Sequence, residues 1–373
     1  LRDDLTKQCA KYREDIHEIA GMEFNVNSTK QLREVLFEKL GLTPGKKTKT
    51  GFSTNAATLE RLRSEHPIVE KILSYREVEK LRSTYGEGLL SSVGAEDRIR
   101  ATFKQTVART GRLSSDAPNL HNIPVRTEAG RAFRKAFVPA EGFSLLVADY
   151  NQIELRCIAH LAEDPGLIRA FEAGEDVHTS VAAQVWNLDL SEVDYETRSR
   201  AKMVSYGLAY GMEAYGLAQR LDIPREEASD ILTAFFDAFP AVREYMDRSI
   251  EEARKKGYTE TLFGRRRRIP ELSSSNFNVR QAGERQAMNS AIQGLAADIF
   301  KVALIEIDEH IEKQSLESRL ILQVHDEVIL EVPSEEEDHV LEKVPEIMKN
   351  AYDLRVDLEV NMSFGSTWAD AKG

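Results

Sequence analysis

The sequence predicts an α+β fold in which one sheet is assembled from segments that lie far apart in the chain. Long stretches repeat apolar residues at intervals of three and four, as helices do, and this pattern dominates the first ninety residues and residues 153–254. Short runs rich in β-forming residues separate and follow these stretches. The order of helical region, strands, helical insertion and strands favours a mixed fold over an all-helical one.

The expected elements follow in chain order. We expect helices at 2–19 and 59–81, with a basic, turn-rich segment at 44–51 between them, and then strands at 99–106 and 144–148. Helices should follow from 153 to 254, with breaks at Pro165-Gly166, Gly211 and Phe239-Pro240, and then a hairpin at 257–268 and a polar stretch at 273–278. The last expected elements are helices at about 279–290 and 294–314 and strands at 320–324 and 328–332.

Composition excludes several classes of protein. The 373 residues contain no unbroken apolar stretch long enough for a transmembrane helix, so we expect no membrane partner. Two cysteines, Cys9 and Cys157, are too few for a disulfide framework or a cysteine-rich zinc site, and they suit a reducing cytoplasm. Because the chain begins with Leu rather than Met, we expect it to be a fragment of a longer protein.

The net charge of −12 is unevenly distributed. Residues 302–373 hold 18 acidic and 6 basic side chains, which account for the whole excess. In contrast, residues 98–135 carry nine Lys or Arg against two acids, and residues 254–268 carry seven against one. Local fields rather than net charge attract a polyanion, so these clusters are compatible with nucleic-acid binding. Each cluster by itself is equally explained as a solvated surface.

Two acidic positions adjoin apolar strands. Asp149 ends the run 144–149, and Asp326 lies between the strands 320–324 and 328–332. Asp149 is also explained as a helix N-cap, as is Asn151, and Asp326 as a turn residue. The segment His325-Asp-Glu327 lacks the Asn-Gly or Asp-Gly of a tight hairpin, so we expect a projecting acidic tip. If both acids meet at one sheet edge, they offer the hard oxygen ligands that Mg²⁺ prefers.

Two polar stripes follow helical spacing. Arg198, Lys202 and Tyr206 recur at i, i+4 and i+8 without an evident acidic partner. This spacing suits a triphosphate clamp, or alternatively exposed cations with apolar stems. A second stripe has the same spacing and suits minor-groove edges of a duplex, or alternatively a buried polar seam: Arg285, Asn289 and Gln293.

These motifs together resemble those of family A DNA polymerases. Asp149-Tyr-Asn-Gln-Ile-Glu-Leu-Arg156 is similar to the first carboxylate motif, and Gln323-Val-His-Asp-Glu-Val328 is similar to the second. Arg198-x3-Lys202-x3-Tyr206-Gly-x2-Tyr210-Gly211 resembles the fingers helix. Thr110–Ser115 with Pro118–Pro124 resembles the template-primer segment. The resemblance implies a right-hand polymerase with a helical thumb at 1–93, a palm with an antiparallel sheet at 94–154 and 276–373, and helical fingers at 155–275.

The resemblance also implies an activity and its residues. The expected reaction is template-directed addition of dNTPs to a primer 3′-OH by a monomer that binds primer-template DNA, with two Mg²⁺ ions held by Asp149 and Asp326. Lys202 is the expected general acid, Glu154 excludes a 2′-OH, and Glu327 is a weaker catalytic candidate. The implied dNTP-binding residues are Arg198, Lys202, Tyr206, Tyr210, His178, Glu154 and Gln152. The implied DNA-binding residues are Arg112, Asn122, Arg285, Asn289, Gln293 and His325.

Three residues depart from the common pattern of the family. Asn151 replaces a frequent Ser and His121 a frequent Gln, and the second change bears on a template contact. Tyr206 replaces the more frequent Phe, and within the family a Tyr here implies ready acceptance of dideoxynucleotides. Judged by its own local pattern, His178 is a helix-surface residue. Three rivals remain at this point: a single-subunit RNA polymerase, a two-metal nuclease and a duplex-binding module that has lost its chemistry.

Overall fold

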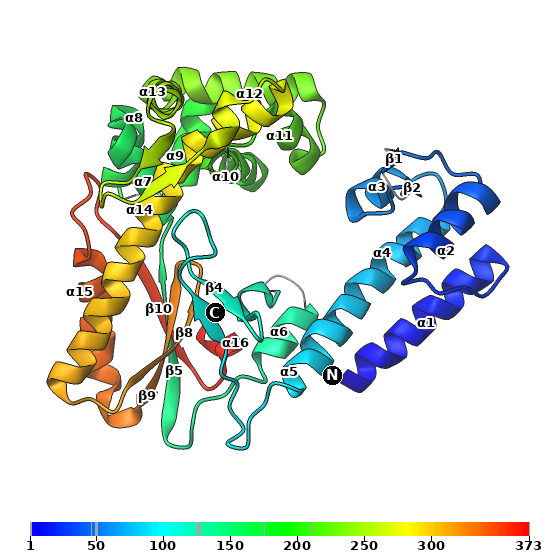
Figure 1. Ribbon diagram of the computed structural model, residues 1–373. Helices are drawn as coiled ribbons and strands as arrows, with labels where there is room; N and C mark the ends of the chain where they lie inside the picture. The colour runs from blue at the N-terminus through cyan, green and yellow to red at the C-terminus, as the bar shows by residue number, and fades with distance from the viewer. Residues whose placement is uncertain are drawn as a thin grey trace. The chain divides into compact units, whose positions relative to one another are not determined.

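The computed structural model describes residues 2–45, 47–48, 51–124, 128–174, 176–209 and 211–372. Contacts between Cα atoms divide the chain into two units (Figure 1). The first unit comprises residues 1–102 and 115–136, and the second comprises residues 103–114 and 137–373. The predicted thumb, palm and fingers boundaries are not tested by this division and stay predictions.

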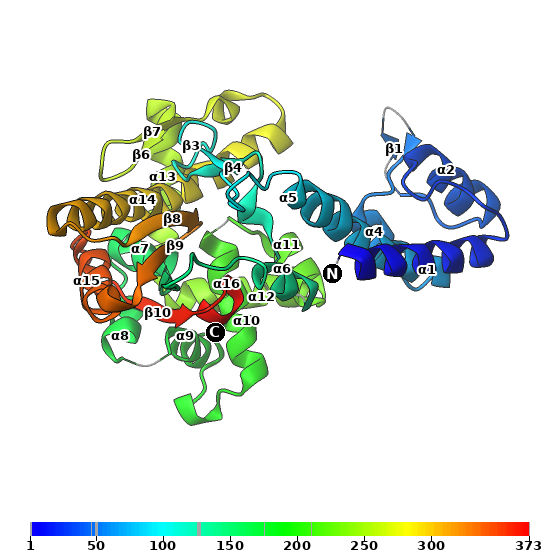
Figure 2. The ribbon, with the colours of Figure 1, turned by 90° about the horizontal axis from the view of Figure 1, so that it is seen from below.

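The first unit is mainly helical and has a hydrophobic core of its own. Helix α1 (Arg2–Ala20) lies along α4 (Pro67–Lys80), as Figure 2 shows, and the core buries Ile16, Leu32 and Ile72. The other elements of this unit are α2 (Thr29–Arg33), η1 (Glu34–Lys39), β1 (Lys47–Thr48), β2 (Gly51–Phe52), α3 (Ala56–Arg61), η2 (Leu81–Glu87), α5 (Gly88–Leu90), η3 (Leu120–Asn122) and α6 (Glu128–Arg134).

The predicted helix at 59–81 is interrupted. Helix α3 ends at Arg61, and α4 begins at Pro67 with His66 as its N-cap. The His66 ring accepts a hydrogen bond from the backbone N–H of Ile68 at 3.3 Å. Pro67 starts a new helix here because its fixed φ suits the first helical position, where no N–H is needed.

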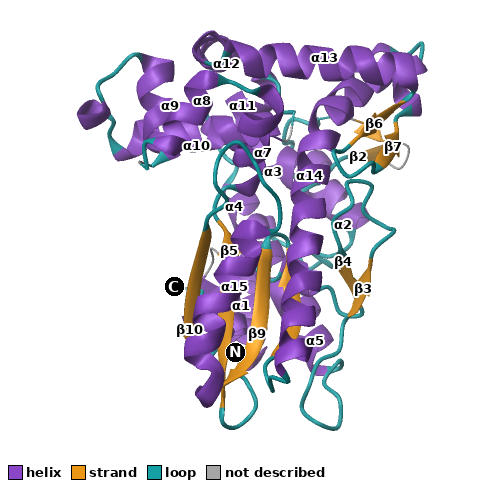
Figure 3. Cartoon of the chain, turned by 90° about the vertical axis from the view of Figure 1, so that its left-hand side faces the viewer, coloured by secondary structure: helices purple, strands orange, loops and turns teal. Residues whose placement is uncertain are grey.

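The second unit contains the predicted sheet. It is fully antiparallel in the order β10-β5-β9-β8, and Figure 3 shows β10, β5 and β9 side by side. The strands are β5 (Phe143–Tyr150), β8 (Arg319–Val324), β9 (Glu327–Pro333) and β10 (Val360–Gly365). Because β5 pairs with β9 and β10, which come much later in the chain, the expectation of a sheet built from distant segments is confirmed. The α+β fold class is confirmed with it.

The two faces of the sheet have different neighbours. Helices α14 (Phe277–Gln314) and α15 (Glu337–Asn350) lie on one face, and α16 (Trp368–Ala371) lies on the other (Figure 1). Successive strand residues point to opposite faces. Tyr150 therefore joins the core beneath the helices, where its hydroxyl donates to the carbonyl of Met348 at 2.6 Å. Asp149 points toward the face that α16 covers.

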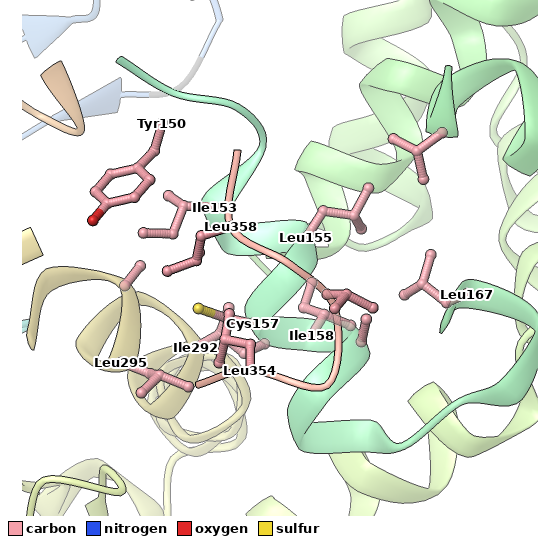
Figure 4. Packing of buried hydrophobic residues seen from close by; sticks show 14 of the residues in the cluster. Tyr150, Ile153, Leu155, Cys157, Ile158, Leu167, Ile292, Leu295, Leu354 and Leu358 are labelled. Carbon is pink, nitrogen blue, oxygen red and sulfur yellow. The ribbon is translucent and has the colours of Figure 1, made fainter. Parts of the chain in front are cut away.

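The helical insertion follows β5 and packs on the same core. Figure 4 shows Cys157 and Ile158 of α7 close to Ile292 and Leu295 of α14. The elements of this stretch are α7 (Ile153–Ala162), α8 (Pro165–Glu172), α9 (Val177–Trp186), η4 (Leu190–Glu192), α10 (Tyr195–Ala209), α11 (Ala214–Leu221), α12 (Arg225–Ala238), α13 (Pro240–Lys256), β6 (Tyr258–Glu260), β7 (Arg266–Arg268) and η5 (Pro270–Ser273). The predicted breaks and the hairpin at 257–268 are confirmed.

The two helices expected at 279–290 and 294–314 are one helix of 38 residues, α14. Gly294 lies within this helix without breaking it, and the packing around it requires a small residue at this position. A Cβ on Gly294 would lie 2.5 Å from Cγ2 of Thr261 in the β6–β7 hairpin, so glycine allows the close approach of the hairpin.

The prediction of the strand at 99–106 was too long. Within that range the structure has only the short strand β3 (Thr102–Lys104), which pairs with β4 (Ser114–Asp116). None of the helices in the described part of the chain is long and apolar enough to cross a membrane.

Candidate active site

Two acids 177 residues apart in the chain meet at one end of the sheet. Asp149 lies near the end of β5, directly opposite Glu327 of β9 in the antiparallel register. The next residue, Tyr150, donates its backbone N–H to the carbonyl of Asp326 at 3.2 Å. The pairing of β5 with β9 thus brings the two carboxylates expected from the sequence into one site.

The environment of Asp149 opposes its ionisation. Burial, followed by the negative charge of Asp326, raises the pKa of Asp149 to about 6. Lys372 acts in the opposite direction, with its Nζ 3.5 Å from Oδ2 of Asp149. A divalent cation between the two aspartates would relieve this repulsion.

The donor set fits Mg²⁺. Among the residues that the structure describes, no cluster of three or more His, Cys, Asp or Glu side chains has the geometry of a metal site. The protein therefore offers two carboxylates rather than a complete cage. Mg²⁺ prefers hard oxygen ligands and is commonly held by one or two carboxylates together with water and substrate phosphates.

The N-cap role considered for Asp149 and Asn151 is not supported. Asp149 lies within β5 rather than at a helix end, and the residue that caps α7 is Gln152, at φ 55°. Asn151 contacts Glu359 instead, with its Nδ2 3.3 Å from Oε2. The N-cap role considered for Asp149 and Asn151 is therefore wrong.

The expectation of a projecting tip at His325-Asp-Glu327 was wrong, and the turn role considered for Asp326 is confirmed. His325 and Asp326 form a two-residue turn between β8 and β9, and His325 has the positive φ of 57° that such a turn requires. Glu327 belongs to β9 and is only 1% exposed. Its carboxylate accepts a hydrogen bond from Trp368 Nε1 at 3.0 Å and contacts Lys372, so its side chain is anchored within the fold.

Helix α10 carries the predicted cationic stripe, and one of its members has an acidic partner. Arg198 donates two hydrogen bonds to Asp176, from Nε at 3.0 Å and from NH2 at 2.7 Å. The prediction of a stripe without acidic partners was thus wrong for Arg198. Burial raises the pKa of Asp176, but hydrogen bonds from Arg198 and Thr179 outweigh burial and bring it to about 2. Lys202 is exposed, and no ion pair within the described residues involves it.

His178 lies beneath the same helix rather than on the surface. Its side chain is 2% exposed, and its ring centroid is 5.7 Å from that of Tyr206. Neither ring nitrogen has a hydrogen-bond partner among the described residues. Burial, together with the positive charges of Lys202 and Arg198, lowers the pKa of His178 to about 4. The prediction of a helix-surface residue was wrong, and Tyr210 lies outside the described residues.

The second predicted stripe lies on α14 and faces the end of α10. Asn289 and Gln293 are buried, whereas Arg285 is half-buried and donates to Glu213 at 3.0 Å. Gly211 has φ 65°, and a Cβ there would lie 2.7 Å from Nδ2 of Asn289. The stripe therefore combines a buried polar seam with a cation at its outer end.

Arg112 and Glu154 form an ion pair beside the acids. Arg112 NH2 donates to Oε1 of Glu154 at 2.6 Å, and Glu154 is 5% exposed. Arg112 also lines one cavity with His325 and Asp326. The remaining predicted site residue, Asn122, lies in the other unit, where its carbonyl accepts a hydrogen bond from the hydroxyl of Tyr85.

Three charged partners were missed by the sequence reasoning. They are Asp176, Glu213 and Lys372, each of which pairs with a predicted site residue or with the acids. Only Asp176 could have been singled out from the sequence, because an Asp directly before a helical run is a typical N-cap. The other two are brought into place by tertiary packing alone.

Comparison with known proteins agrees with these motifs. The family model described as DNA polymerase family A matches residues 1–370. DNA polymerase I of Geobacillus stearothermophilus is 50% identical over 371 residues, which cover 99% of this chain and 42% of that protein. DNA polymerase I of Mycobacterium tuberculosis (strain ATCC 25618 / H37Rv) is 47% identical over 371 residues, covering 99% of this chain and 41% of that protein.

A solved structure is similar over the whole chain. It is described as the POL domain of Pol1 from M. smegmatis in complex with DNA primer-template and dNTP. It has a TM-score of 0.94 and 48% identity, and the match covers 100% of this chain and 66% of that one. The chain spans less than half the length of the curated relatives named above. The expected right-hand polymerase fold is confirmed by this neighbour, and the chain belongs to DNA polymerase family A.

Proposed function

We propose that this chain catalyses template-directed DNA synthesis, adding dNTPs to the 3′-OH of a primer paired with a template. The observation that carries the proposal is that Asp149 and Asp326 lie close together. Tyr150, which follows Asp149, donates its backbone N–H to the carbonyl of Asp326. Two adjacent carboxylates, together with the Arg198 and Lys202 cations of α10, suit phosphoryl transfer, which depends on positioning and charge stabilisation. The complex described for the M. smegmatis neighbour supports primer-template DNA and dNTP as the partners.

Asp149 and Asp326 would hold two Mg²⁺ ions. When bound, Mg²⁺ supplies Lewis-acid chemistry that activates the primer hydroxyl and neutralises charge on the transferred phosphate. Lys202 would hold a proton on Nζ and give it to the leaving pyrophosphate. Arg198 would bind the β- and γ-phosphates, and to do so it must exchange its carboxylate partner Asp176 for the phosphate oxygens.

The other predicted residues would recognise the sugar, the base pair and the duplex. Glu154, paired with Arg112, would lie beneath the sugar and reject a 2′-OH. Tyr206 would stack near the incoming base, and its hydroxyl would allow efficient use of dideoxynucleotides. The remaining assignments are proposals of the same kind: His178, Gln152 and Tyr210 for the nucleotide, and Asn122, Arg285, Asn289, Gln293 and His325 for DNA. Magnesium dependence and a cytoplasmic location likewise stay predictions.

Primer extension tests the proposal directly. We expect Mg²⁺-dependent extension with dNTPs and much weaker extension with rNTPs. Asp149→Ala and Asp326→Ala should each abolish extension while primer-template affinity, measured by fluorescence anisotropy, survives. Asp308→Ala, which removes an exposed acid from α14, is the matched control and should extend normally. Degradation of the primer would indicate a nuclease, and equal use of rNTPs would indicate an RNA polymerase.

A separate measurement tests Tyr206. The proposal predicts comparable incorporation of ddTTP and dTTP by the unmodified chain, and a strong preference for dTTP in the Tyr206→Phe variant. Rejection of ddTTP by the unmodified chain would refute the role of the hydroxyl without affecting the proposed polymerase activity.

A further inference from the structure

A buried carboxylate outside the proposed catalytic set lies on α14. Asp298 is 4% exposed, and both of its oxygens are used. Oδ2 accepts the hydroxyl hydrogen of Thr261 at 2.7 Å, and Oδ1 accepts from Arg265 Nε at 2.7 Å. Arg265 NH2 lies 2.6 Å from the same Oδ1. Removal of this carboxylate takes away the acceptor of the Thr261 hydroxyl and of the Arg265 guanidinium, whose side chain is 37% exposed.

Through these contacts Asp298 links the β6–β7 hairpin to α14. Thr261 and Arg265 bracket the turn of that hairpin, and they also bond to each other through their backbones, with Thr261 N–H donating to the Arg265 carbonyl at 3.0 Å. The hairpin and α14 pack closely here, because Gly294 lies one turn before Asp298 on α14 and leaves no room for a Cβ against Thr261. These contacts fix the position of the hairpin on this part of α14.

Arg265 also contacts the loop that contains Arg112. A Cβ on Gly111 would lie 2.6 Å from Arg265 Nε and 2.8 Å from its Cδ, so the side chain of Arg265 lies directly over the Gly111 backbone. Gly111 has φ 89°, a left-handed conformation that glycine adopts readily. The adjacent residue, Arg112, makes the 2.6 Å hydrogen bond to Glu154.

We propose that Asp298 is a positioning residue that sets the Arg112–Glu154 pair through Arg265 and Gly111. The inference rests on the proposed function, in which Arg112 binds DNA and Glu154 discriminates the sugar. All five residues lie in the same unit of the chain. Because the guanidinium of Arg265 needs the Asp298 carboxylate to hold it over Gly111, loss of that charge frees the loop and loosens the pair that selects deoxyribose.

Asp298→Asn is the test variant, because it keeps the size of the side chain and removes its charge. We expect the ratio of kcat/KM for dNTP to that for rNTP to fall by about tenfold, less than the roughly hundredfold effect of a 1 Å misplacement, because the pair is loosened rather than removed. Primer-template affinity, measured by anisotropy without nucleotide, should weaken several-fold. The conservative variant Arg265→Lys keeps a cation but cannot contact Asp298 Oδ1 through two nitrogens, so its preference for dNTP over rNTP should also fall.

Two controls separate positioning from simple destabilisation. Asp164→Asn removes another buried carboxylate with several hydrogen bonds, between α8 and α13, and should lower stability without changing sugar discrimination. In an Arg112→Ala background, Asp298→Asn should add no further loss of discrimination, because residues that act through one contact are non-additive.

The outcomes are distinct. If the unmodified chain extends primers but Asp298→Asn discriminates as well as Asp164→Asn does, the positioning role is overturned and the proposed function stands. Full additivity with Arg112→Ala would also overturn it. If the unmodified chain does not extend primers at all, the proposed function itself fails. In that case, unchanged duplex affinity of Asp298→Asn would overturn the positioning role as well.

Discussion

Replacement of Asp164 by Ala should destabilise the second unit more than the loss of an ordinary helix cap. Asp164 is 1% exposed and precedes α8. Its Oδ1 accepts the N–H groups of Gly166 at 2.9 Å and Leu167 at 3.0 Å, and its Oδ2 accepts the N–H of Ala241 in the first turn of α13 at 3.1 Å. One carboxylate thus satisfies three backbone donors from two helices.

The magnitude follows from these contacts. Loss of an N-cap costs about 1 kcal/mol, and a buried N–H left without an acceptor costs about 1–3 kcal/mol. Allowing for partial access of water to the vacated site, we expect Asp164→Ala to lower the free energy of unfolding by about 3 kcal/mol. Asp164→Asn should cost about half as much, because its amide oxygen keeps the two bonds at α8 while its NH₂ group opposes the N–H of Ala241.

Urea unfolding followed by far-UV circular dichroism measures these changes. The matched control is Asp194→Ala, which removes an exposed Asp that accepts the N–H of Thr197 at 2.7 Å. That substitution should cost no more than about 1 kcal/mol. If Asp164→Ala costs no more than Asp194→Ala, the three buried donors do not depend on the carboxylate, and the reasoning is refuted.

Three other substitutions test packing and protonation. Because the pKa of His178 is lowered to about 4, its neutral form is favoured in the folded chain. The free energy of unfolding should therefore fall by about 3 kcal/mol as pH falls from about 6.5 to 4. His178→Phe should remove much of that acid loss in urea titrations at pH 7.5 and 4.5; an unchanged loss would contradict the assignment. Gly365→Ala places a Cβ 2.3 Å from the Ala371 backbone nitrogen, so α16 must shift, with a cost of about 1–3 kcal/mol and altered tryptophan fluorescence; native fluorescence and stability would contradict this packing. Gly294→Ala should cost a similar amount, and Thr261→Ser, which removes the obstructing methyl, should restore most of it; failure of that rescue would place the strain elsewhere.

Local sequence was sufficient for the elements whose patterns are local. The breaks at Pro165 and Pro240 and the hairpin at 257–268 follow from backbone restrictions that residue type imposes directly. The sequence pattern also predicted two helices, at 279–290 and 294–314, where the structure has the single helix α14. Tertiary packing decided otherwise, since the hairpin residue Thr261 occupies the space where a side chain would lie.

The active-site acids show the same division. Their residue types and their positions beside apolar strands identified Asp149 and Asp326 as candidates, and the family motifs named the cations of α10. The partners of those groups could not be predicted in the same way. Arg285 pairs with Glu213, which lies 72 residues away in the chain, and Lys372, the residue directly after α16, lies close to Asp149.

The sequence by itself determined many of the helices, the strands β5, β8 and β9, and the chemical character of the candidate site, because periodicity, turn residues and motif spacing act over a few residues. Only the tertiary structure decided which charges meet, that His178 is buried beneath Tyr206, and that Asp298 is linked to Arg112 through Arg265. The physical reason is that ionisation and burial depend on what surrounds a group in space, and strand pairing between distant segments sets those surroundings.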